Sequence, residues 1–188
     1  MHVAAVQQRQ AHALVIVRVP EVELYVAKLR ERFDPAARRG LGAHVTLLHA
    51  PLPPGGIDPA MVVAVVTTAA AVTPFAFMVT RVARFATTLY LAVEPAEPFA
   101  SLHRSLTALV PNTPSAGRPQ REFVPHISVV RQGSGAALAE HVFAEAEDEL
   151  AQALARDGPI PCVCRELVLL EDATGTWRPV LTQACGRS

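Results

Sequence analysis

The chain has 188 residues, of which 51% are hydrophobic and 18% charged, so it carries enough apolar material to bury the core of one ordinary domain. This composition argues against a disordered chain. Its 17 basic and 17 acidic residues cancel, so nothing in the overall charge indicates a basic coat for nucleic acid or a membrane-binding surface.

Local features of the sequence predict a cytoplasmic protein that does not enter a membrane. Residues 1–10 have neither the basic start nor the apolar stretch of a secretory signal. The most apolar run, Ala60 to Val72, is shorter than the roughly 20 residues that a bilayer-spanning helix needs. Three cysteines, at 162, 164 and 185, do not make a disulfide framework and fit a reducing compartment.

The first half of the chain alternates between predicted strands and helices. Val- and Ile-rich stretches indicate strands, Pro20 opens a helix, and Asp58 can cap the helix that follows the run of Pro and Gly after residue 50. In chain order we predict a strand at Ala11 to Val19, a helix at Pro20 to Phe33, a strand at Ala43 to His49, a helix at Asp58 to Val72, and strands at Phe75 to Phe85 and Leu89 to Val93.

The second half repeats this order without the opening strand. In chain order we predict a helix at Glu97 to Val110, a surface loop at Pro111 to Gln120, a strand at Phe123 to Val130, a helix at Ala136 to Ala155, and strands at Ile160 to Leu170 and Trp177 to Thr182. The acidic residues between 140 and 157 are interpreted as the solvated face of the last helix. The order predicts an α+β fold: one domain over residues 1–188, made of two similar antiparallel-sheet lobes flanked by helices around a central cleft.

A short motif occurs in both halves, as A-H-V-T-L-L-H at 43–49 and as P-H-I-S-V-V-R at 125–131. Each copy reads His, apolar, Thr or Ser, apolar. With seven histidines in the chain, chance alone gives roughly 0.35 such matches, whereas two are present. The repeat therefore favours a shared role for the two copies over coincidence.

Strand geometry assigns the motif residues to faces. Successive side chains alternate, so His44 lies beside Thr46, and His126 lies beside Ser128. Strict alternation puts Arg131, five positions after His126, on the opposite face, from which it either reaches a phosphate at the strand end or faces solvent.

The same alternation separates His44 from His49, which argues against zinc held by both. The cysteines at 162 and 164 also lack the second ligand pair of a zinc site, and are read as small strand residues.

Two imidazoles and two hydroxyls suit phosphoryl transfer. Histidine has an ordinary pKa near 6.5, so one neutral ring can take a proton while the other, protonated, gives one. Hydroxyl groups can hold the oxygens of a phosphate or phosphodiester. The sequence has no Gly-rich phosphate loop, nucleotide fingerprint or paired catalytic carboxylates, so we expect no metal, no ATP and no other cofactor.

Four stretches resemble the 2H phosphoesterase superfamily, and within it the 2′-5′ RNA ligase-like and cyclic phosphodiesterase-like proteins. They are G-A-H-V-T-L-L at 42–48, R-F-A-T-T-L-Y-L-A-V-E-P at 84–95, P-F-A-S-L-H-R-S-L at 98–106 and F-V-P-H-I-S-V-V-R at 123–131. The resemblance implies a bilobal fold in which His44 and His126 are acid and base, while Thr46 and Ser128 hold phosphate oxygens. His49 stands where many relatives have an aromatic residue.

The resemblance implies a metal-independent phosphodiesterase acting on 2′,3′-cyclic phosphates or RNA ends. Two alternatives stay open: 2′-5′ RNA ligation without ATP at the same site, and an RNA-binding protein that keeps the cleft without turnover. Tyr90 and Phe123 are candidates for stacking on a base, although both also fit a core strand. We expect a monomer whose partners are RNA ends or cyclic nucleotides. The motifs are near copies, so the sequence does not assign which histidine is the base.

Overall fold

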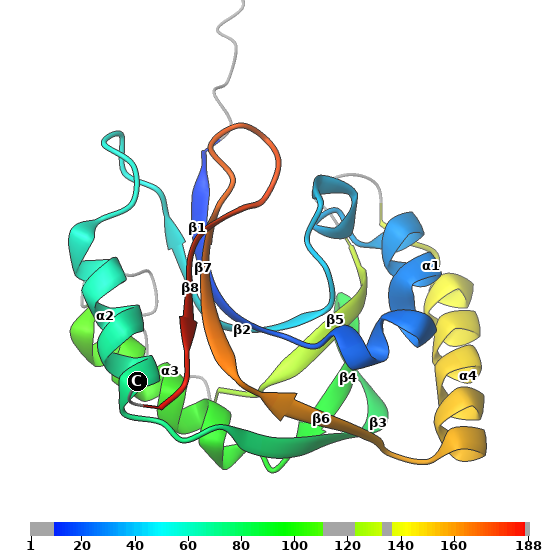
Figure 1. The fold of residues 1–188 in the computed structure, drawn as a ribbon. Coiled ribbons are helices and arrows are strands. Elements are labelled where there is room, and N and C mark those ends of the chain that lie inside the picture. The colour runs from blue at the N-terminus through cyan, green and yellow to red at the C-terminus, as the bar shows by residue number, and fades with distance from the viewer. Residues whose placement is uncertain (1–9, 111–122, 133–136, 187–188) are drawn as a thin grey trace, which may run out of the picture.

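Two four-stranded antiparallel sheets form the centre of the molecule (Figure 1). The computed structural model describes residues 10–110, 123–132 and 137–186. The first sheet has the strand order β2 (His44–Pro51), β1 (His12–Arg18), β7 (Glu166–Glu171), β8 (Arg178–Ala184). The second sheet has the order β5 (His126–Arg131), β4 (Thr88–Glu94), β3 (Phe75–Phe85), β6 (Ile160–Cys164).

Helices cover the sheets on both sides of the view in Figure 1. They are α1 (Glu23–Phe33), α2 (Pro59–Ala70), α3 (Glu97–Leu109) and α4 (Glu140–Asp157), with short 3-10 turns η1 (Pro20–Val22) and η2 (Ala37–Arg39). Helices α2 and α3 contact the first sheet, whereas α1 and α4 contact the second. Helix α1 thus leaves a strand of one sheet and packs on the other, and α3 does the converse, which ties the two sheets into one core.

The predicted α+β class with two antiparallel sheets and flanking helices is confirmed. One predicted element is wrong: the strand at Ile160 to Leu170 is two strands, because the chain leaves the second sheet at Cys164 and enters the first at Glu166. The first sheet therefore combines strands from both ends of the chain, so the two lobes are not simply its two halves. The predicted loop at Pro111 to Gln120 lies outside the described residues.

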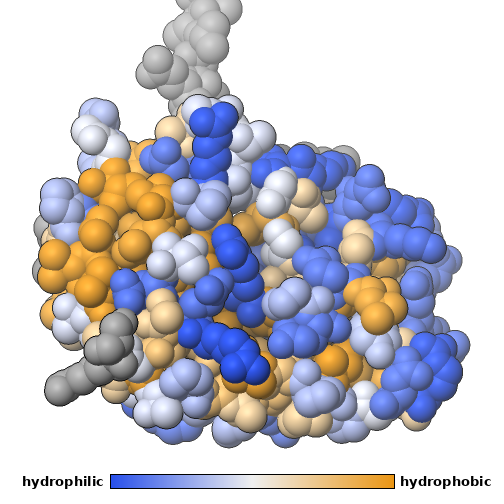
Figure 2. Space-filling model, in the orientation of Figure 1, coloured by the Kyte–Doolittle hydropathy of each residue, from blue (hydrophilic) through white to orange (hydrophobic). Residues whose placement is uncertain are grey.

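The helices differ in the surface they present. Figure 2 shows hydrophobic residues gathered over the α2 side and hydrophilic residues over the side of α1 and α4. Helix α4 buries Phe143, Ala146 and Leu150 and leaves its acidic residues to solvent, as expected for a solvated helix face. No helix in the described part of the chain is both long and apolar enough to cross a bilayer.

Each histidine strand contains a β-bulge at the same distance from its histidine. Opposite β1, Thr46 pairs with Ile16 and Leu48 pairs with Val15, so Leu47 is the extra residue. Leu47 and Leu48 are both buried in the main core, which interrupts the alternation of faces.

The same irregularity occurs in β5. Ser128 pairs with Tyr90 and Val130 with Leu89, so Val129 is the extra residue, and both valines are buried in the main core. Residues after each bulge are consequently on the opposite face from the one that strict alternation predicts.

Candidate active site

The two motif histidines are held by the same hydrogen bond. His44 Nδ1 lies 2.7 Å from the carbonyl oxygen of Gly42, and His126 Nδ1 lies 2.8 Å from that of Val124. A carbonyl can only accept, so Nδ1 carries the hydrogen in both rings. The neutral tautomer then leaves the lone pair of Nε2 on each ring, and Nε2 is the atom that can take up or release a proton.

The two histidines differ in burial, and burial lowers the pKa of each. His44 is 9% exposed, and burial lowers its pKa from 6.5 to about 4, with the positive charge of Arg30 acting in the same direction. His126 is only half-buried, and burial also lowers its pKa, helped by Arg131. In each case the hydrogen bond to the backbone carbonyl opposes this effect. Both rings are thus disposed to be neutral in the ligand-free protein.

The bulges bring Arg131 to the histidine face, which corrects its expected position on the opposite face. Arg131 pairs with Thr88 of β4, and Ser128 pairs with Tyr90 of the same strand. Thr88 and Tyr90 are two positions apart and share a face, so Arg131 lies on the face of Ser128. The Arg131 side chain is exposed, and its charge lowers the pKa of His44 as well as that of His126. One guanidinium therefore lies within electrostatic reach of both histidines, and β2 and β5 contact each other.

The two hydroxyl residues occupy equivalent places beside the histidines. Thr46 and Ser128 are both half-buried, each two positions after its histidine and before the bulge, where alternation still holds. Each therefore shares a face with its histidine. The arrangement can offer two hydroxyls, two imidazoles and a guanidinium to one anionic group.

Aromatic rings pack around His126. Tyr90 and Phe85 contact its ring edge-to-face, with centroids 5.2 and 5.1 Å away, and stack on each other at 4.3 Å. Tyr90 is 7% exposed, so its ring packs against the imidazole and offers little open surface. Phe85, at 38% exposure, is the more accessible of the two rings. Sequence analysis missed Phe85, although it stands in the R-F-A-T-T stretch.

Phe123 packs against α3, and its stacking on a base stays a prediction. Its ring stacks on His103 of α3 with centroids 4.3 Å apart, and His103 Nδ1 donates to the carbonyl of Leu47 at 2.7 Å. Leu47 is the bulge residue of β2, so this pair supports the bulge from the helix side of the sheet. The aromatic character of Phe123 is explained by this packing without a nucleotide.

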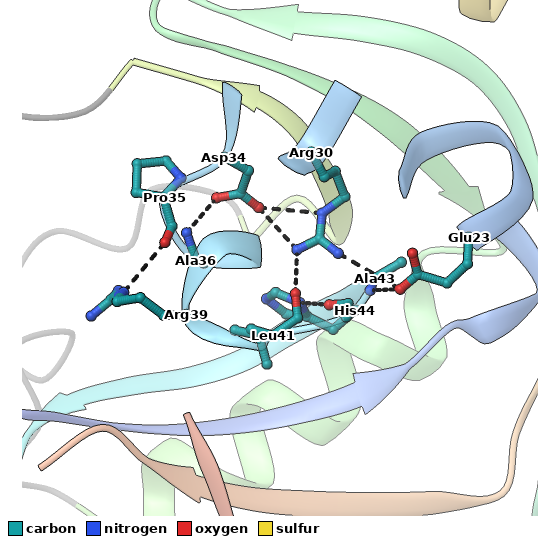
Figure 3. A network of polar contacts seen from close by, with 10 residues as sticks. Glu23, Arg30, Asp34, Pro35, Ala36, Arg39, Leu41, Ala43 and His44 are labelled. Atoms are coloured by element: carbon teal, nitrogen blue, oxygen red, sulfur yellow. Dashed lines mark hydrogen bonds and ion pairs between the residues drawn. The ribbon is translucent and has the colours of Figure 1, made fainter. Parts of the chain in front are cut away.

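A buried ion-pair network holds the backbone that leads into His44 (Figure 3). Arg30 is 2% exposed and Asp34 1% exposed, and they form two hydrogen bonds of 2.9 and 3.2 Å. Arg30 also donates to the carbonyl of Leu41 at 2.9 Å. Glu23 completes the network, because its carboxylate lies 3.8 Å from Arg30 and accepts from the backbone N–H of Ala43.

The network fixes the segment that carries the hydrogen-bond acceptor of His44. Leu41 and Ala43 are both held through their backbone, and Gly42 between them supplies the carbonyl for His44 Nδ1. A Cβ at position 42 would lie 2.9 Å from the Glu23 carboxylate, so a glycine is needed there for close approach. From sequence alone Arg30 looks like an ordinary surface residue of a charged helix.

The described residues contain no group of three or more His, Cys, Asp or Glu side chains placed to hold a metal ion. Cys162 and Cys164 are buried on β6, and the Cys162 thiol points to the carbonyl of Ile160 at 3.5 Å. Their position agrees with their interpretation as small strand residues. The expectation that His49 lies on the face opposite His44 is wrong, since the bulge returns His49 to the histidine face, where it pairs with Leu14.

Each sheet carries a motif histidine on its edge strand, β2 or β5, and these two edge strands contact each other. This arrangement defines a class of two-histidine α+β proteins. Residues 19–176, most of the chain, match the 2′-5′ RNA ligase superfamily. The chain belongs to this superfamily, whose members are 2H phosphoesterases, as the resemblance of the two motifs implied. No curated protein sequence matches the chain.

Solved structures share the fold at low sequence identity. The structure of TT0787 from Thermus thermophilus has a TM-score of 0.61 and 18% identity, covering 94% of this chain and 99% of that one. E. coli LigT complexed with NADP+ has a TM-score of 0.58 and 16% identity, covering 95% and 99%. E. coli LigT complexed with 3′-AMP has a TM-score of 0.58 and 15% identity, covering 94% and 98%.

Replacing Arg30 with Met is expected to destabilise the protein by about 3–5 kcal/mol, because it leaves the Asp34 carboxylate buried without its charged partner. Denaturant unfolding measures this change. The matched control is Arg156→Met, which removes an exposed pair with Asp157 and should cost less than about 1 kcal/mol. Equal losses in the two variants would contradict the structural role of the network.

Acidification is expected to destabilise the protein through its neutral histidines. Since the pKa of His44 falls from 6.5 to about 4 on folding, the unfolded chain binds more protons between these values. The free energy of unfolding therefore falls as the pH drops through this window, and His126 acts in the same direction. Urea unfolding at about pH 7.5 and about pH 5 should show a smaller loss for His44→Gln than for the wild type. Identical losses would contradict the buried neutral state of His44.

Proposed function

We propose that the chain is a phosphodiesterase that hydrolyses 2′,3′-cyclic phosphates or phosphodiesters at RNA ends, with His44 and His126 as its proton-transfer groups. The observation that carries this proposal is the identical setting of the two imidazoles. Each presents Nε2 because Nδ1 donates to a carbonyl two residues earlier, and each lies within reach of the Arg131 charge. Membership of the 2′-5′ RNA ligase superfamily supports the same chemistry.

The proposed step balances with these groups alone. Nε2 of one neutral histidine takes a proton from water while the water oxygen forms a bond to phosphorus. The bond from phosphorus to one ribose oxygen breaks, and Nε2–H of the other, protonated histidine gives that oxygen its proton. The product is a phosphomonoester next to a free hydroxyl. Thr46, Ser128 and Arg131 would hold the phosphate oxygens and offset their negative charge.

Burial favours His44 as the base in this direction. A group with a pKa of about 4 is neutral at physiological pH, so its Nε2 lone pair is available, and burial at the same time makes it a weaker base than an ordinary histidine. His126 is more exposed, and an anionic phosphate next to it raises its pKa and favours its protonated form. The two histidines would exchange roles when the reaction runs in reverse.

A nucleotide-type substrate fits the surroundings of His126. Phe85 lies at the edge of the site with an exposed ring, and aromatic faces are the usual stacking partners of unpaired bases. Structures of E. coli LigT, which shares the fold, were obtained with 3′-AMP and with NADP+. We extend this ligand class to the present chain as part of the proposal.

Formation of 2′-5′ bonds is a second candidate activity, favoured by the superfamily to which the chain belongs. The reactants would be one RNA end with a 2′,3′-cyclic phosphate and a second RNA end with a free hydroxyl. The reaction is the same as hydrolysis, except that this ribose hydroxyl takes the place of water. The base would then take its proton from that hydroxyl. No nucleotide triphosphate enters this balance, because the cyclic ester supplies the energy.

Replacing either His44 or His126 with Ala is expected to lower turnover of a 2′,3′-cyclic nucleotide by at least about 100-fold, because each variant lacks one proton-transfer group. Chromatography of the phosphomonoester product measures the rate, with EDTA present throughout. The matched control is His141→Ala, which removes an exposed histidine of α4 and should leave the rate unchanged.

Full activity in either motif variant would contradict the proposal. Binding of RNA ends without product in the wild-type protein would instead support the non-catalytic alternative. Circular dichroism of the variants separates loss of chemistry from loss of folding.

A further inference from the structure

The residue five positions after each motif histidine lies at an equivalent place in the two strands. In β5 this residue is Arg131, and in β2 it is His49. Each follows a bulge three positions after the histidine, so each returns to the histidine face. His49 of the first sheet therefore occupies the position that corresponds to Arg131 in the second sheet.

His49 is hydrogen-bonded to a second imidazole. Its Nε2 lies 3.0 Å from Nδ1 of His12 on the neighbouring strand β1, and the ring centroids are 4.7 Å apart. One hydrogen occupies the space between these two nitrogens, so one ring donates to the other. The second nitrogen of each ring, Nδ1 of His49 and Nε2 of His12, is the atom that can engage a ligand.

The charges around the pair favour an anion. Burial lowers the pKa of His49, and His12 and the positive charge of Arg131 act in the same direction, whereas Asp172 acts in the opposite direction. The Asp172 carboxylate is fully buried, accepts from the backbone N–H of His12 at 2.6 Å and forms an ion pair with Arg39 at 2.6 Å. Its negative charge is thus engaged by Arg39, and a protonated pair would add positive charge beside Arg131.

We propose that His49 and His12 form an anion subsite that binds a second phosphate group of the substrate, beside the phosphate that reacts. The identity of the first phosphate rests on the proposed function. Along an extended strand with one bulge, position 49 lies roughly 13 Å from position 44, too far for both residues to share one phosphate through short side chains. The charge of Arg131 acts on both His44 and His49.

The subsite would select substrates with phosphate at both ends of a nucleoside unit. A substrate with only the reacting phosphate leaves the histidine pair unoccupied. Binding of a second phosphate favours the protonated pair, so the preference should grow as the pH falls.

Calorimetric binding of two product-like nucleotides, in EDTA near pH 6, tests the subsite without turnover. Wild-type protein is expected to bind adenosine 3′,5′-bisphosphate about tenfold more tightly than adenosine 3′-monophosphate. In His49→Phe and in His12→Phe this ratio should fall to about twofold or less. His141→Phe, on the exposed surface of α4, should keep the wild-type ratio.

A milder variant separates charge from packing. Replacing both rings, His12→Gln together with His49→Gln, keeps hydrogen-bond donors at the site but removes both groups that can gain a proton, so the ratio should rise less between about pH 7.5 and about pH 5.5 than in the wild type. This comparison uses a side chain of similar size and stays informative if a Phe variant folds poorly.

A wild-type ratio near one, or a ratio unchanged in His49→Phe, would overturn the subsite. The outcome is independent of catalysis, because binding is measured. A retained ratio in a protein without turnover would overturn the proposed function and leave the subsite standing.

Discussion

The site depends on one local constraint: each motif imidazole donates from Nδ1 to the carbonyl two residues earlier in its own chain. This hydrogen bond sets the tautomer and orients the ring before any substrate arrives. At His44 the acceptor carbonyl is itself held in place, because the Arg30 network fixes the backbone on both sides of Gly42. A buried ion pair is costly to assemble, so its presence next to a candidate base fits a role in positioning that base.

The β-bulges connect this local constraint to the whole site. Without them, residues 49 and 131 would point into the core, where a histidine and an arginine would lose their hydration. With them, two pairs of adjacent apolar residues enter the core, and the polar residues after them join the histidine face. The His103 hydrogen bond to the Leu47 carbonyl shows that the fold supports the irregularity in β2 with a side chain from the covering helix.

Sequence reasoning reached the fold class and the shared faces of each His with its hydroxyl, because these residues precede the bulge and follow simple alternation. For the residues after each bulge, sequence reasoning predicted the wrong face. The Leu47–Leu48 and Val129–Val130 doublets were the visible signal, since two consecutive apolar residues cannot both be buried in a regular half-exposed strand. The burial of Arg30 depends on the carbonyl of Leu41 in a later loop, a tertiary contact that helical periodicity does not encode. Arg165, the charged residue between Cys164 and Glu166, was the corresponding signal for the break between β6 and β7.

In the proposed mechanism, both Nε2 atoms act on one phosphorus atom. A crystal structure with adenosine 3′-monophosphate bound tests it most directly. Phosphate oxygens are expected about 2.6–3.2 Å from Nε2 of His44 and of His126, with the hydroxyls of Thr46 and Ser128 also in contact. A phosphate bound by only one of the histidines, or seated on another surface, would contradict it.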